Sequence, residues 1–116
     1  MLTKEEIQHK IDYEIVVDCY DDYEVAVGWI TTMNDDIEFP FMATAALKKK
    51  DGLIEYKTVQ IVGLTSDEDD FHGNNFYLSM EEGEYIFPIA YSQLTNIVAS
   101  EQTLELFQCW NHWITT

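Results

Sequence analysis

The chain has 116 residues and carries 22 acidic side chains against six basic ones, all lysines, for a formal charge of −16. This charge repels the phosphates of nucleic acids and anionic membrane surfaces, which excludes both classes of partner. Hydrophobic residues make up 47% of the sequence and aromatic residues 14%, so we expect a folded core rather than disorder. At this length a single domain, residues 1–116, is expected.

Helical patterns dominate residues 3–34. Thr3 and Glu6 have the spacing of a capping box, which predicts a helix start. Apolar residues then recur every four positions, as on one helix face: Ile7, Ile11, Ile15 and Cys19. The β-branched run 15–17 leaves a strand there as an open alternative. A second helix is predicted over 23–33, although Gly28 disfavours it by about 1 kcal/mol relative to alanine. Its expected apolar side is formed by Tyr23, Ala26, Val27 and Ile30.

Residues 36–99 are predicted to form about five short strands. Apolar and polar residues alternate over 36–41, where Pro40 suggests a sheet edge or a bulge. Lys50-Asp51-Gly52 is a turn signal. The other strand candidates are residues 58–64, 75–80, 85–89 and 93–99, with residues 81–84 as the turn of a hairpin.

A helical pattern returns over residues 101–114, with Ser100 as the N-cap. Leu106, Trp110 and Trp113 share one face of this helix. The order of elements predicts an α+β fold, with N-terminal helices, a small antiparallel sheet or partly closed β-barrel, and a C-terminal helix.

The cysteine pattern and the N-terminal sequence indicate the compartment. Cys19 and Cys109 lie far apart in the sequence, and the charged start of the chain does not have the form of a secretory signal. We interpret both cysteines as reduced core residues of a cytoplasmic protein.

The carboxylates are clustered, which suggests a cation site. Ca²⁺ accepts about six to eight oxygen ligands in irregular geometry, and a carboxylate-rich loop supplies such oxygens. Three clusters provide the candidate metal ligands: Asp18, Asp21 and Asp22; Asp35, Asp36 and Glu38; and Asp67, Glu68, Asp69 and Asp70. A fourth cluster, Glu81, Glu82 and Glu84, falls in the hairpin turn. On a helix, positions 18, 21 and 22 would share a face. In a strand, Asp36 and Glu38 would point the same way.

None of the clusters fits the EF-hand loop. A pattern that begins at Asp67 has His72 where glycine is needed and Leu78 in place of the final glutamate. Acidic clustering alone therefore leaves a solvated acidic surface as the alternative to a site. The sequence also lacks nucleophile-elbow, zinc-protease and phosphate-loop motifs, and we expect a protein that is not an enzyme.

A longer pattern frames these clusters. It runs from about residue 12 to residue 114 and includes residues 14–21, residues 26–29, Phe39-Pro40-Phe41, residues 62–64, Glu68-Asp69-Asp70, residues 87–89, residues 92–94 and Trp110-Asn111-His112-Trp113. In this order the chain resembles the small acidic calcium-binding protein family of cyanobacteria. The resemblance implies a non-EF-hand protein that binds Ca²⁺ and buffers or senses the free cytosolic ion. It does not say which carboxylates coordinate the ion.

A second function remains open. The chain has no positive side chain after Lys57. An acidic interaction module that binds a basic protein partner would have the same property. Such a module would be sensitive to salt and indifferent to calcium.

Overall fold

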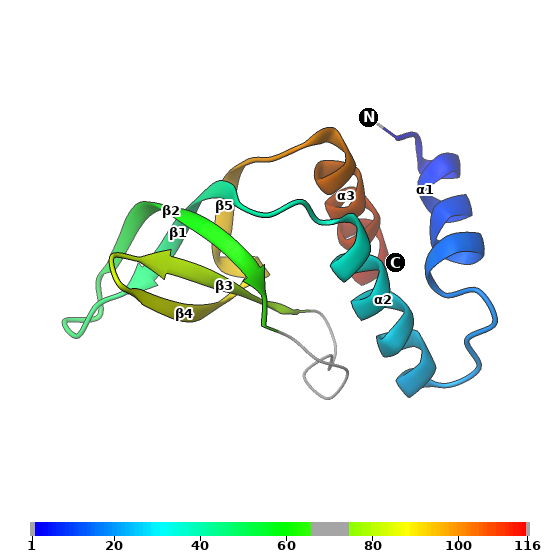
Figure 1. Ribbon diagram of the computed structural model, residues 1–116, viewed down its shortest axis with the longest axis horizontal. Coiled ribbons are helices and arrows are strands. Elements are labelled where there is room, and N and C mark those ends of the chain that lie inside the picture. Colours follow the sequence, from blue (N-terminus) through cyan, green and yellow to red (C-terminus); the bar gives the residue numbers. More distant parts are fainter. Residues whose placement is uncertain (1, 66–74, 116) are drawn as a thin grey trace.

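The computed structural model describes residues 2–65 and 75–115 of the chain. A five-stranded sheet forms one half of an elongated molecule of 45 × 29 × 25 Å, and the helices form the other half (Figure 1). The described elements, in chain order, are α1 (Lys4–Lys10), η1 (Ile11–Ile15), α2 (Asp22–Asp36), β1 (Phe41–Lys48), β2 (Ile54–Leu64), β3 (Tyr77–Glu82), β4 (Tyr85–Ala90), η2 (Tyr91–Gln93), β5 (Leu94–Val98) and α3 (Glu101–Thr115).

The sheet is open, with the strand order β4-β3-β2-β1-β5 and antiparallel pairing throughout. The predicted α+β fold is confirmed. Of the two predicted forms of the sheet, the structure has the open antiparallel sheet and not the partly closed barrel. The predicted turn at residues 50–52 joins β1 to β2, where Gly52 has a φ of +86°. Gly83 turns β3 into β4 with a φ of +61°. Both glycines adopt a backbone conformation that side chains disfavour.

Both edges of the sheet carry features that limit pairing with another chain. On β4, the Ala90 N–H donates to Gln93 Oε1 at 3.2 Å, which shows that this backbone position faces away from β3. Pro88, two residues earlier, faces the same way and has no N–H to offer. On β5, Asn96 has a φ of 48° and lies at a shift in register against β1. Proline and a bulge are two common ways to protect a strand edge.

The first helix begins at the predicted cap, but the N-terminal segment does not form a single continuous helix. The Thr3–Glu6 capping box forms, with Glu6 N–H donating to Thr3 Oγ1 at 3.2 Å. The chain then widens into a π-helix over Ile11–Ile15 and turns, so the alternative strand at 15–17 does not form. A Cβ on Gly28 would lie 2.4 Å from the carbonyl oxygen of Ile15. Glycine therefore lets the end of η1 approach α2.

The apolar face of α2 differs from the predicted one. Ala26, Trp29 and Met33 are buried, whereas Tyr23 is 59% exposed and Val27 is 37% exposed. The spacing of three and four residues in 26, 29 and 33 follows the helical repeat, and it centres the buried face on the large indole of Trp29. The placement of Tyr23 and Val27 on that face was wrong.

An aromatic cluster joins the helices to the sheet. Trp110 of α3 meets the rings of Trp29 and Phe76 edge-on, with centroid distances of 5.2 and 5.1 Å. Phe107 contacts Phe41 at the start of β1, at 5.7 Å. Cys109 lies within this core and is fully buried, as predicted. The other thiol, at position 19, is half-buried, and both cysteines are free.

Two predicted strands have different limits in the structure. Residues 36–41 do not form one strand, because Asp36 ends α2 and β1 begins at Phe41. Pro40 therefore precedes a strand in the interior of the sheet order, and its placement at an edge or bulge was wrong. β2 begins at Ile54 rather than at residue 58. Within the described ranges, no helix combines the length and the apolar character needed to cross a membrane.

Candidate metal centre

The four carboxylates Asp67, Glu68, Asp69 and Asp70 lie outside the described residues, but both flanks of that segment are held in place. At the first flank, Thr65 N–H donates to the Tyr77 carbonyl at 3.0 Å, and the Thr65 and Ser79 hydroxyls are 2.5 Å apart. These bonds extend the β2–β3 ladder to Thr65, two residues before Asp67.

The second flank is anchored to the aromatic core. Asn75 Nδ2 donates to Ser92 Oγ at 2.8 Å, and the Ser92 N–H donates back to Asn75 Oδ1 at 3.3 Å. The Tyr91 N–H donates to the Phe76 carbonyl at 2.9 Å, and the two rings stack with centroids 4.9 Å apart. The segment between Thr65 and Asn75 is therefore anchored at both ends to the sheet and the aromatic core.

The cluster Asp18, Asp21 and Asp22 occupies the turn between η1 and α2, and all three side chains are exposed. Asp18 has a φ of 57°, and Asp21 is extended as the N-cap of α2, so these positions do not share a helix face. Asp21 Oδ1 accepts the Glu24 N–H at 2.8 Å, which uses one of its oxygens to cap the helix. Of the three carboxylates in this turn, Asp21 therefore already accepts a hydrogen bond from the backbone.

The cluster Asp35, Asp36 and Glu38 lies at the other end of α2, where α3 fixes its backbone. The Glu38 N–H donates to the buried Thr103 Oγ1 at 2.9 Å, and Gln102 Nε2 donates to the Asp36 carbonyl at 3.2 Å. Asp36 also pairs with Lys10 of α1 at 3.5 Å. The predicted strand geometry for Asp36 and Glu38 was wrong, because a helix end separates them.

These two clusters do not converge. They lie at opposite ends of α2, whose 15 residues span about 22 Å at 1.5 Å per residue. Calcium–oxygen distances are about 2.3–2.6 Å, so one ion cannot be bound at both ends. Over residues 2–65 and 75–115, no group of three or more His, Cys, Asp or Glu side chains is arranged to hold a metal ion.

Sequence reasoning missed an acidic groove between α1 and α3. It is a hollow of about 480 Å³ that includes Glu5, Glu6, Glu14 and Glu105 together with Lys10. The Thr3 N–H hydrogen bond lowers the pKa of the Glu6 carboxyl. The spacing of four residues between positions 6, 10 and 14 could have indicated one face, but Glu105 comes from a distant part of the chain.

Comparison with known proteins identifies the class to which this fold and these acidic clusters belong. A family model described as calcium binding, the CcbP family, matches residues 9–114. The chain is a member of this calcium-binding family, as the sequence pattern predicted. No curated protein sequence matches the chain.

Two solved structures are similar over nearly their whole length. The crystal structure of Anabaena CcbP has a TM-score of 0.81 and 30% identity, and the match covers 98% of this chain and 93% of that one. A calcium-binding protein in its calcium-binding form has a TM-score of 0.77 and 28% identity, with 97% and 91% covered. The cyanobacterial family predicted from the sequence is therefore confirmed, and Ca²⁺ is its ion.

Proposed function

We propose that this protein binds Ca²⁺ and, as a non-enzymatic protein of the cytoplasm, buffers or senses the free ion. The match of the calcium-binding family model to residues 9–114 carries the proposal. Support comes from the similar fold of a relative solved in its calcium-binding form.

We propose that the centre of the site is formed by Asp67, Glu68, Asp69 and Asp70. Described residues alone do not assemble a metal-binding group. The anchored flanks at Thr65 and Asn75 reduce the entropy that would be lost when the segment between them is ordered around an ion. Ligands from Asp35, Asp36 and Glu38, or from Asp18, Asp21 and Asp22, belong to separate ions, because α2 keeps these clusters apart.

Ion binding should stabilise the fold by neutralising carboxylates that repel one another. Two carboxylates about 6 Å apart repel by roughly 0.7 kcal/mol even in bulk water. Mass action adds about 2.7 kcal/mol of stability when calcium is present at a hundredfold excess over Kd. We expect a Kd on the order of micromolar or weaker, as is common for flexible carboxylate sites.

A sensor differs from a buffer by a change outside the ion site. Phe76 joins the acidic segment to the core, because it stacks on Tyr91 and meets the Trp110 ring edge-on. A sensor should therefore change tryptophan emission when calcium binds, with a midpoint equal to the calorimetric Kd. A buffer should bind the ion with emission unchanged.

Calorimetric titration with Ca²⁺ in excess Mg²⁺, together with thermal melts, tests the function. We expect saturable heat and a rise in melting temperature. The absence of both effects below about millimolar calcium would refute the proposed function.

The variant Asp67→Asn, Glu68→Gln, Asp69→Asn, Asp70→Asn tests the ligands. Its matched control removes four charges elsewhere, by Glu5→Gln, Asp12→Asn, Glu81→Gln and Glu84→Gln. If both variants lose the same calcium affinity, the loss comes from net charge and not from removal of ligands. If the first variant binds calcium with unchanged affinity, the ligands belong instead to a cluster at one end of α2.

A further inference from the structure

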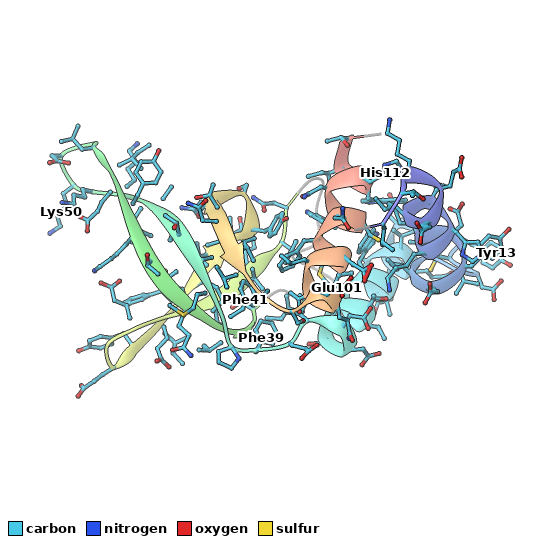
Figure 2. The ribbon with its side chains drawn as sticks, turned by 90° about the horizontal axis from the view of Figure 1, so that it is seen from above. Tyr13, Phe39, Phe41, Lys50, Glu101 and His112 are labelled. Atoms are coloured by element: carbon cyan, nitrogen blue, oxygen red, sulfur yellow. The ribbon has the colours of Figure 1, made fainter. Side chains whose placement is uncertain are left out.

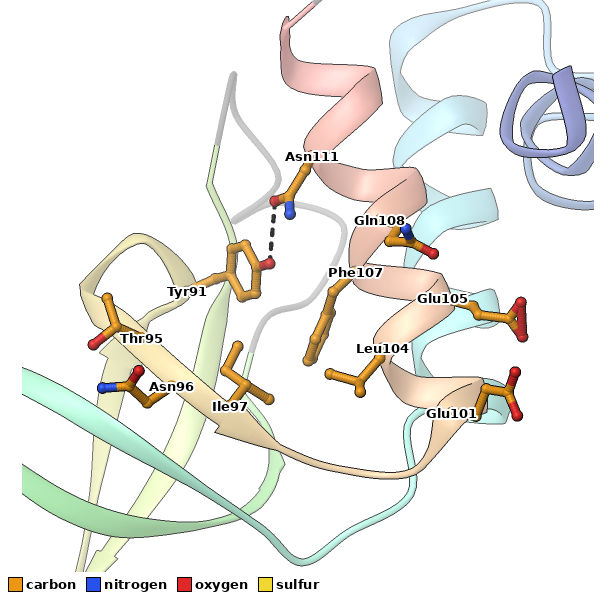
Figure 3. Close-up of a pocket in the computed structure, with 10 residues that line it drawn as sticks. All are labelled: Tyr91, Thr95, Asn96, Ile97, Glu101, Leu104, Glu105, Phe107, Gln108 and Asn111. Carbon is orange, nitrogen blue, oxygen red and sulfur yellow. Dashed lines mark hydrogen bonds between the residues drawn. The ribbon is translucent and has the colours of Figure 1, made fainter. Parts of the chain in front are cut away.

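A groove between the edge strand β5 and the helix α3 has no role in the calcium proposal. Figure 3 shows the residues that line it. Its volume of about 470 Å³ lies within the range of about 300–1,000 Å³ that is usual for ligand sites. Tyr91, Ile97, Leu104 and Phe107 give it apolar walls, and Tyr91 is fixed by its hydroxyl, which donates to Asn111 Oδ1 at 3.1 Å. The groove is therefore able to take an apolar group.

Negative charge lies beside these apolar walls. Glu101 and Glu105 lie one turn apart on α3, and the described lining contains no lysine. Asn96, Gln108 and Asn111 add amide groups. In an overall charge of −16, this combination favours an apolar group that lies next to a positive charge.

The shape of the groove favours an extended chain. Thr95, Asn96 and Ile97 are consecutive, and all three line it. Successive strand residues point to opposite faces, so a groove that touches all three runs along the edge of β5. β5 is an outer strand of the sheet, and its outward backbone groups can pair with an added segment. The positive φ of Asn96 limits such pairing to a short stretch.

We propose that this groove binds a short extended segment of a partner protein, in which an apolar side chain is flanked by lysine or arginine. The apolar side chain packs between Ile97 and Leu104, and the flanking cations face Glu101 and Glu105. This interaction is separate from calcium binding and does not require it.

A second copy of the chain is the competing occupant. The turn between β1 and β2 carries Lys48, Lys49 and Lys50 next to Leu53, which is 67% exposed. A tight turn does not lie along a strand edge as an extended segment does, and acidic copies repel one another. Sedimentation at increasing protein concentration separates the two occupants. Self-association that is lost in Leu104→Ala would overturn the proposal of a different partner.

Three acetylated and amidated hexapeptides probe the groove directly: Lys-Thr-Leu-Thr-Lys-Thr and its phenylalanine and tryptophan counterparts. The matched negative peptides carry glutamate in place of both lysines. In ¹H–¹⁵N spectra of the full chain we expect at least one basic peptide to shift the amide signals of β5 and α3, with Kd below about 1 mM. The acidic peptides should produce no shift. The titrations are run both in chelator and in calcium, so that the result is independent of the ion site.

Variants assign the binding to the groove. Glu101→Gln with Glu105→Gln should weaken the basic peptide about tenfold, and Leu104→Ala about fivefold. The controls are Glu84→Gln, in the distant β3–β4 turn, and Val98→Ala, whose side chain is 71% exposed on β5 outside the groove. Both should bind like the unchanged chain. No binding by any basic peptide in either condition, or equal losses in lining and control variants, would overturn the proposal.

Discussion

The N-terminal helices and the β1–β2 hairpin carry opposite charge. Residues 1–36 hold ten carboxylates and two lysines, a charge of −8, whereas residues 41–64 hold two carboxylates and four lysines, a charge of +2. Figure 2 shows Lys50 at the far end of the sheet, away from Tyr13 and His112 in the helical half. The surplus negative charge is therefore a local property of certain segments, and the hairpin does not share it.

The two regions also differ in how their charges are paired. In the hairpin, Lys49 lies 2.6 Å from Glu55, and Lys57 lies 2.6 Å from Glu82 of β3. In the helical half, Lys10 of α1 lies at the longer distance of 3.5 Å from Asp36 of α2. Lys49 and Lys57 of the hairpin are thus each paired with a carboxylate, whereas residues 1–36 hold ten carboxylates and only two lysines.

The largest expected effect concerns the packing of η1 on α2. Gly28→Ala should destabilise the protein by about 2–3 kcal/mol, because the new Cβ would collide with the Ile15 carbonyl. Helix propensity alone would predict a gain of about 1 kcal/mol. Urea unfolding measures the difference. Gly63→Ala is the control in the sheet, where the nearest atoms outside adjacent residues lie 4.0 Å from the added Cβ. Similar effects at both positions would contradict the close approach.

The two thiols should differ in reactivity, because Cys109 is buried in the core and Cys19 is half-buried. Burial raises the pKa of the Cys109 thiol to about 11, so its reactive thiolate is scarce at pH 8. Burial, followed by the Glu24 carboxylate, also raises the pKa of Cys19, but this side chain is half-buried. We expect an aromatic disulfide reagent to label Cys19 on the order of a hundredfold faster than Cys109, and both thiols at similar rates in denaturant. Equal rates in the folded protein would contradict the buried position of Cys109.

A smaller effect should distinguish the two ends of α2. In chelator, Asp35→Asn should stabilise the fold by about 0.5 kcal/mol, because it removes a negative charge from the C-terminal end of the helix. Asp22→Asn should lower stability by a similar amount, because its charge favours the N-terminal end. Thermal melts at low salt compare the pair. Changes of the same sign would indicate that overall repulsion outweighs the helix dipole.

The smallest effect is expected at the ion pairs of the hairpin. The hydrogen bond to Glu82 raises the pKa of Lys57. The stability that it provides is therefore complete below the unfolded pKa of lysine and is lost as pH rises through the folded value. For Glu55, the Lys49 hydrogen bond lowers the pKa, so that stability is lost as pH falls through the folded value. Lys57→Gln should slightly lower the urea midpoint at neutral pH. A difference that persists at about 1 M salt would contradict this origin.

Local signals in the sequence predicted the starts of the helices better than their buried faces. Thr3 with Glu6 and Ser100 with Thr103 form the expected caps, because such bonds involve residues three positions apart. The approach of Ile15 to Gly28 depends on the turn between two helices, and no local propensity encodes it. The end of α2 at Asp36 was missed because Thr103 and Gln102 of α3 hold that backbone in place.

The family could be predicted from the sequence, whereas the ligand set could not. The order and spacing of short motifs can be read from the sequence alone. They indicated the calcium-binding family that the comparisons confirm. Coordination depends on distances between clusters, which the sequence does not contain. The separation of Asp22 from Asp35 along α2 is the clearest case, because the sequence listed both clusters as candidate ligands without the distance between them.

The protected sheet edges bear on how abundant the protein can be. A stoichiometric buffer must reach concentrations comparable with those of the ion it stores, and crowded copies with open strand edges would assemble into aggregates. Pro88 and the Gln93 side chain close one border of the sheet, and the irregular backbone at Asn96 shortens the other. If the protein acts as the buffer proposed above, these three residues would let it reach the concentration that buffering needs without pairing of its sheet edges.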